Sequence, residues 1–319
     1  MKKSTFWLVS LVIWTSLMVP MPLSNAAVTG AAISAAEAAG TTATGPKASE
    51  KPPAPVQPDS TITSPSLKDA VQQWIQSISG QQGFQAWKQA EWTSQPLGPG
   101  THGWIVLLQS QGSPVGYMVI HAADPNNPSK FRLTEYGRGS TPLFSMQTLY
   151  QSLVQLDLIN SSYKTERLYV DPLHAVWKIT DADNFYYIDA KTGEVLPLQT
   201  DSDLQESGGS SADEAYTRLE PGQSIGASLQ LPEFDPYDRL PWVKNAPAAY
   251  ESFAALRSDL ERHKKLTYTA QLYNGKVTSP FAVTGYHQWS GEDAFLLLEQ
   301  NGQRAIPYAA ACKLGKLYP

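Results

Sequence analysis

The chain has 319 residues, a formal net charge of −5 and 42% hydrophobic residues, so it is long enough for one large or two small globular domains. The acidic balance and the lack of a dense Lys/Arg run argue against a nucleic-acid partner, because phosphate binding needs clustered positive charge. Cys312 is the only cysteine, which rules out an intramolecular disulfide. We expect its thiol to be buried, since it stands among small residues.

Residues 1–26 have the pattern of a secretory signal peptide. Lys2 and Lys3 precede an apolar run over 6–19. Ser24-Asn25-Ala26 then places small residues at the positions that signal peptidase recognises, so we expect cleavage after Ala26. The run is shorter than the roughly 20 residues that span a membrane. No cysteine lies near residue 26, so we expect a secreted bacterial protein, on the exterior of the cell envelope, with no stable membrane anchor after cleavage.

Residues 27–65 are rich in Ala, Pro and Thr and contain no aromatic residue, which predicts a disordered linker. A helix is expected from Ser66 as N-cap to Gly80, because apolar residues recur at spacings of three and four between them. Three apolar segments bounded by turn residues then predict an antiparallel meander, namely 103–108, 114–120 and 130–137.

A second helix is predicted over Ser145–Leu158. Its expected apolar face is formed by Met146, Leu149, Tyr150, Leu153 and Leu156.

The segment Tyr186–Val195 reads "YYIDAKTGEV" and predicts a strand, a tight turn and a second strand. Asp189 and Gly193 are the structural turn residues, and Gly193 tolerates the positive φ that such a turn needs. Together with "AVWKI" at 175–179, this wording resembles the PepSY family over about residues 166–198. The resemblance implies a small secreted module that acts by peptide or protein contact, with no invariant catalytic residue to carry over.

A second similarity, to the propeptide and inhibitor modules of streptopain-type secreted cysteine peptidases, rests on residues of the expected meander. They are Trp104, Gly116, Tyr117, Tyr136 and Gly137. A plain meander also uses such residues for packing and turns. Together, the two resemblances imply one PepSY-like α+β domain over 66–200 and an extracellular peptidase as a partner.

Residues 201–245 are acidic and rich in Ser, Gly and Pro, so we expect a flexible linker there. Residues 246–319 are predicted to form a small α+β or barrel-like domain. It consists of a helix from Pro247 to about Lys264 and strands joined at Asn274-Gly275 and Asn301-Gly302.

Chemistry-bearing motifs are few. Gly222-Gln223-Ser224-Ile225-Gly226 matches G-x-S-x-G, but the flanking segments lack the strand and helix of a nucleophile elbow. The histidines show no metal-ligand spacing, so we expect no metal, no cofactor and no catalytic residue. Tyr286, His287 and Trp289 could bind a sugar or a partner side chain if exposed, although core packing is the simpler interpretation.

The fold class expected is therefore α+β, with a helix plus an antiparallel meander followed by a small helix-plus-β-barrel-like domain. The function expected is a secreted, non-catalytic binding or regulatory protein that modulates an extracellular peptidase. A protein that binds cell-wall glycan is the alternative, and a serine hydrolase using Ser224 ranks last.

Overall fold

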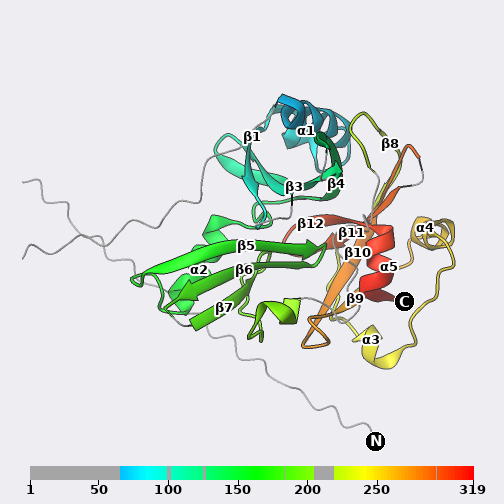
Figure 1. Ribbon diagram of the computed structural model, residues 1–319. Coiled ribbons are helices and arrows are strands. Elements are labelled where there is room, and N and C mark those ends of the chain that lie inside the picture. Colours follow the sequence, from blue (N-terminus) through cyan, green and yellow to red (C-terminus); the bar gives the residue numbers. More distant parts are fainter. Residues whose placement is uncertain (1–64, 99–101, 125–126, 183, 205–218, 292) are drawn as a thin grey trace, which may run out of the picture. The chain divides into compact units, whose positions relative to one another are not determined.

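The computed structural model describes residues 65–98, 102–124, 127–182, 184–204, 219–291 and 293–319, all within one compact unit that spans 51–319. The predicted cleavage site at Ala26 and nearly all of the predicted linker over 27–65 lie outside these residues. The fold is mixed α+β, and the strand pairings are antiparallel (Figure 1). No described helix is both long enough and apolar enough to cross a membrane.

Helices are short and lie on the surfaces of two sheets. They are α1 (Pro65–Ile78), α2 (Met146–Gln155), α3 (Pro241–Lys244), α4 (Phe253–Glu261) and α5 (Tyr308–Leu314), with 3₁₀ helices η1 (Gln85–Gln89) and η2 (Asp201–Leu204).

The larger sheet has the strand order β1-β2-β3-β4-β12-β11-β10-β9-β13, and β8 also pairs with β10. Its strands are β1 (Glu91–Pro96), β2 (Gly103–Ser110), β3 (Ser113–Asp124), β4 (Asn127–Arg138), β8 (Ile225–Gln230), β9 (Thr267–Leu272), β10 (Val277–Trp289), β11 (Ala294–Glu299), β12 (Gln303–Pro307) and β13 (Gly315–Tyr318). The smaller sheet has the order β5-β6-β7, formed by β5 (Tyr163–Asp171), β6 (His174–Asp181) and β7 (Asn184–Asp189).

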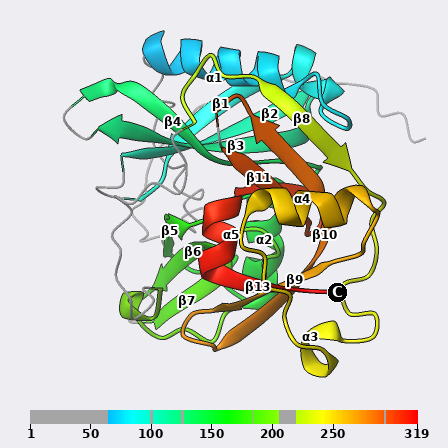
Figure 2. The same ribbon diagram turned by 90° about the vertical axis from the view of Figure 1, so that its right-hand side faces the viewer.

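The larger sheet is covered on both faces, which explains why its strands are apolar runs rather than alternating segments. On β3, Met118 and Ile120 pack in the core under α1, whereas Tyr117 and Val119 pack in the core shared with α2 and the smaller sheet. The C-terminal strands add a third core, which α4 and α5 cover (Figure 2).

The two predicted domains share this sheet. Ala305 on β12 pairs with Tyr136 on β4, which joins the N-terminal meander directly to the C-terminal strands. The segment 201–245, expected to be a linker, contains β8, which pairs with β10. The expectation of a separate barrel-like domain is therefore not confirmed, because the C-terminal strands complete a common sheet.

Two helix predictions need correction. Residues 247–252 are not helical, and α4 begins after Ser252, whose side chain accepts a hydrogen bond from the backbone N–H of Ala255. On α2, Leu149 and Leu153 are buried as expected, but Met146 and Tyr150 are exposed. The first predicted helix corresponds to α1, whose apolar face is buried.

Candidate functional site

The predicted binding aromatics lie inside the protein. Tyr286, His287 and Trp289 are only 2%, 3% and 2% exposed, because both faces of β10 are covered: Tyr286 packs in the core with α4, and Trp289 packs in the core with α1. His287 Nδ1 lies 2.7 Å from the hydroxyl oxygen of Tyr136. The hydroxyl of Tyr286 donates to Glu261 at 2.8 Å. These residues are therefore core residues, as the simpler interpretation of the sequence had it, and the condition of exposure on which a binding site at them depended is not met.

Ser224 lies immediately before β8, so a strand rather than a helix follows the motif G-x-S-x-G. Its backbone N–H donates to Ser290 Oγ at 3.1 Å, and its carbonyl accepts from the Ser290 N–H at 2.7 Å. This is a backbone link between two chain segments. It differs from the strained strand-to-helix turn that exposes a catalytic serine.

A buried ionic cluster joins the two parts of the chain. Glu135 on β4 is fully buried and accepts from Arg304 Nε at 2.9 Å, across the pairing of β4 with β12. Its carboxylate also accepts from the hydroxyls of Tyr117 at 2.5 Å and Tyr169 at 3.0 Å. Burial and the neighbouring Glu135 raise the pKa of Tyr117 well above its usual value. The cluster is closed to solvent, so we assign it to structure.

The Asp189–Gly193 turn is held by its own side chains. Asp189 Oδ1 accepts from the backbone N–H groups of Lys191 at 2.9 Å and Thr192 at 2.7 Å, as in an Asx turn. Gly193 has a φ of +78°, the left-handed conformation expected from the sequence.

Lys191 fastens this turn to the C-terminal strands. The side chain is 2% exposed, and its ammonium group donates to the carbonyl of Thr141 and, at 2.9 Å, to that of Asn301. Burial is the main cause that lowers the pKa of Lys191 to about 8. The turn that carries the family resemblance is therefore connected to the β11–β12 hairpin.

Helix α2 packs against the other side of the same turn. Ser152 Oγ donates to the carbonyl of Gly193 at 2.7 Å. A Cβ at Gly193 would lie 2.7 Å from Thr148 Cγ2, so only glycine fits this approach. The buried face of α2 is completed by Leu149 and Leu153, and its N-terminus is capped by Ser145.

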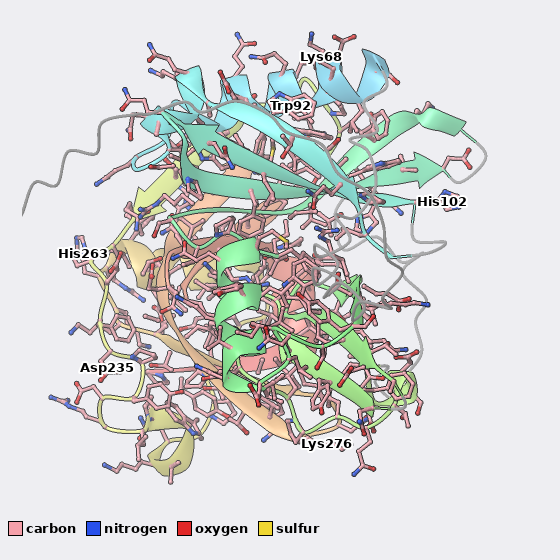
Figure 3. The ribbon with its side chains drawn as sticks, turned by 90° about the vertical axis from the view of Figure 1, so that its left-hand side faces the viewer. Lys68, Trp92, His102, Asp235, His263 and Lys276 are labelled. Atoms are coloured by element: carbon pink, nitrogen blue, oxygen red, sulfur yellow. The ribbon has the colours of Figure 1, made fainter. Side chains whose placement is uncertain are left out.

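The opposite face of α2 is exposed and apolar. Met146, Tyr150 and Val154 are 52%, 60% and 46% exposed, and their i, i+4, i+8 spacing places them in one row. The helix sequence MQTLYQSLVQ contains no charged residue. In Figure 3, α2 is the upright green helix at the centre, with no other described ribbon in front of it. We call this row the α2 face.

Sequence reasoning missed the α2 face because it assigned Met146 and Tyr150 to the core. The apolar residues of α2 form one broad arc, and only the edge of that arc with Leu149 and Leu153 is buried, which the periodicity alone does not show. Cys312 also differs from expectation, because it lies on the outer side of α5 and is exposed.

Within the described ranges, no group of three or more His, Cys, Asp or Glu side chains is placed to hold a metal ion. No protein-family model matches the chain, and no curated protein matches it.

Proposed function

We propose that the protein is an exported, non-catalytic regulatory factor that binds an extracellular peptidase through the α2 face. The observation that carries this proposal is the row of Met146, Tyr150 and Val154, three large apolar side chains left exposed on an uncharged helix. Isolated exposed apolar residues are normal, whereas a contiguous row of them is typical of an interaction site.

The chemistry of the α2 face fits a protein partner. The cores of protein interfaces are poor in charge and rich in Met and aromatic residues, as this row is. Covering three half-exposed side chains would contribute about 3 kcal/mol by removal of apolar area from water. Glutamines 147, 151 and 155 lie beside the row and are exposed, so they can supply hydrogen bonds at a polar rim.

Two further features favour a peptidase as the partner. The hairpin over 186–195 resembles the PepSY family, whose modules act by peptide or protein contact, and the meander is similar to propeptides of secreted cysteine peptidases. The α2 face lies on the helix that packs against this hairpin's turn, since Ser152 bonds Gly193. The surface that would contact the enzyme thus belongs to the unit that carries the resemblance.

The test is inhibition or activation of purified co-secreted peptidases by the mature chain. We expect a saturable, dose-dependent change in the activity of one of them, and a loss of that effect in Tyr150→Glu, because a buried charge would oppose docking. Gln72→Glu on α1 is the matched control, since it adds the same charge to an exposed helical position outside the α2 face and should retain the effect. Equal potency of both variants would contradict docking through the α2 face.

A separate experiment tests the non-catalytic part of the proposal. Ser224 is bonded through its backbone to Ser290, so we expect a fluorophosphonate probe to leave the mature protein unlabelled. Labelling that disappears in Ser224→Ala would support the serine-hydrolase alternative instead. The glycan-binding alternative was based on Tyr286, His287 and Trp289, and these residues are buried, so they cannot contact a glycan.

A further inference from the structure

A pocket of about 370 Å³ lies between α3, β9, α5 and β13, far in sequence from α2. In Figure 2, α5, β13 and β9 lie close together, and α3 is below them. The volume falls within the range of small-molecule sites and is large enough for a hexose carrying one charged group.

The charges around the pocket have one sign. Lys313 and Lys316 line it, both with exposed side chains, and none of the described residues that line it is an Asp or a Glu. The chain as a whole carries a net charge of −5, so this local excess of positive charge is not a consequence of composition. A pocket of this kind favours an anionic ligand.

The walls of the pocket suit a ring with hydroxyl groups. Trp242 and Tyr318 supply aromatic surface, and the Trp242 ring is supported by an edge contact with Tyr237 at 5.7 Å between centroids. Gln271 and Thr278 also line the pocket, and both are exposed. Their side chains can therefore form hydrogen bonds with a hydroxyl-bearing ligand.

We propose that this pocket binds an anionic saccharide, a hexose unit that carries a phosphate or a carboxylate. The lysines pair with the anionic group, Lys316 from β13 in particular. Trp242 and Tyr318 contact the apolar face of the ring, and Thr278 accepts or donates a hydrogen bond with a ring substituent. Such a unit is available either as a free sugar or at the end of an envelope polymer. The proposal is independent of the α2 face and of any peptidase.

Cys312 makes the proposal directly testable. It is the only cysteine of the chain and it is exposed. It lines the proposed pocket and also a neighbouring pocket of about 280 Å³, so its alkylation reports on the occupancy of either one. The uncharged reagent iodoacetamide avoids steering by the lysines. With glucose 6-phosphate at about 10 mM and a millimolar Kd, we expect alkylation to slow by about tenfold, because a bound ligand covers the thiol.

Comparison ligands separate the parts of the proposal. Glucuronic acid should also protect Cys312, whereas glucose and inorganic phosphate should protect it far less. Equal protection by inorganic phosphate would refute the claim that the pocket recognises a sugar ring. Equal protection by glucose would refute the claim that the lysines recognise an anionic group. If neither glucose 6-phosphate nor glucuronic acid protects Cys312, the proposed site is refuted.

Variants then test which lysine recognises the anionic group of the ligand. Lys316→Gln should abolish the protection by glucose 6-phosphate, measured as the ratio of alkylation rates with and without the sugar. Trp242→Ala should reduce it too, because Trp242 lines the proposed pocket and not the neighbouring one that Cys312 and Lys316 also line. Lys68→Gln on α1 is the matched control, as an exposed lysine distant in sequence, and should keep the full ratio. Undiminished protection in Lys316→Gln would overturn the proposed recognition. If free sugars protect, the same assay with cell-wall fragments shows whether polymer ends are also bound.

Discussion

The buried pair of Glu135 and Arg304 offers the sharpest test of the fold. In the variant Glu135→Gln the shape of the side chain is kept, but the guanidinium of Arg304 loses the carboxylate that it contacts at 2.9 Å. Both side chains are at most 2% exposed, so water cannot replace the lost charge. Breaking a buried pair from one side costs about 3–5 kcal/mol, because an uncompensated buried charge remains.

The hydroxyls of Tyr117 and Tyr169 also bond this carboxylate, so a charged acceptor is lost for both. We expect a total destabilisation of about 4 kcal/mol and, for a unit of this size, a fall of about 10 °C in the midpoint of thermal unfolding. The control Glu194→Gln alters an exposed carboxylate and should change stability by less than about 0.5 kcal/mol.

The assay is chemical unfolding of the mature protein, followed by tryptophan fluorescence and by far-UV circular dichroism. Because Glu135 and Arg304 lie on the paired strands β4 and β12, both probes should report one transition that shifts as a whole. In Glu135→Gln/Arg304→Met, no buried charge remains unpaired, so the cost should be smaller than the sum of the single variants. A cost below about 1 kcal/mol for Glu135→Gln, or two separate transitions, would refute the reasoning.

Two more predictions concern a glycine and a histidine. Gly193→Ala should cost about 2 kcal/mol more than Gly275→Ala in the same unfolding assay, because both glycines have φ +78° but only Gly193 is crowded, by Thr148. Equal costs would contradict the close approach. Burial lowers the pKa of His287 to about 3. At His287 the unfolded state therefore binds more protons between pH 3 and about 6.5, so this residue alone should lower stability by about 3 kcal/mol as the pH drops from 6.5 to 4, a contribution that His287→Gln should remove. Burial also lowers the pKa of His121, to about 4, so a further loss should remain in that variant. An unchanged pH slope in that variant would contradict this assignment.

Local elements were predictable from local patterns. The buried positions of α1 recur at helical spacing, and Val71, Trp74 and Ile78 are fully buried where the pattern places them. The Asn301-Gly302 turn was also predictable, because both residues have the positive φ that a two-residue hairpin requires.

Long-range features could not be predicted in this way. The pairing of β4 with β12 joins segments about 165 residues apart, and the sequence of neither strand indicates which other strand it pairs with. The same pairing, together with the neighbours of β10, buries the aromatics that the sequence left open as a binding site. A clue existed only in Arg304, since a lone charge within an apolar strand indicates a buried partner of opposite sign, whereas the strand of Glu135 also carries Lys130, Arg132 and Arg138.

The α2 face was hidden for a different reason. Helical periodicity identifies which residues share a face, but the apolar arc of α2 is wider than its buried face, and the part that is buried depends on the turn at Gly193. That turn packs against the small polar side chains of Thr148 and Ser152, so these two residues are buried. Met146, Tyr150 and Val154, which hydropathy alone would bury, are left exposed.

The most direct measurement of the central claim is photo-cross-linking from the α2 face in culture supernatant. Benzoylphenylalanine at position 150 replaces the exposed Tyr150 with a side chain of similar shape, and the same group at Lys68 on α1 serves as the control position. We predict a covalent adduct between position 150 and a co-secreted peptidase, identified by mass spectrometry, that is absent for position 68. Adducts without a peptidase at position 150, or equal peptidase adducts from both positions, would contradict the proposal.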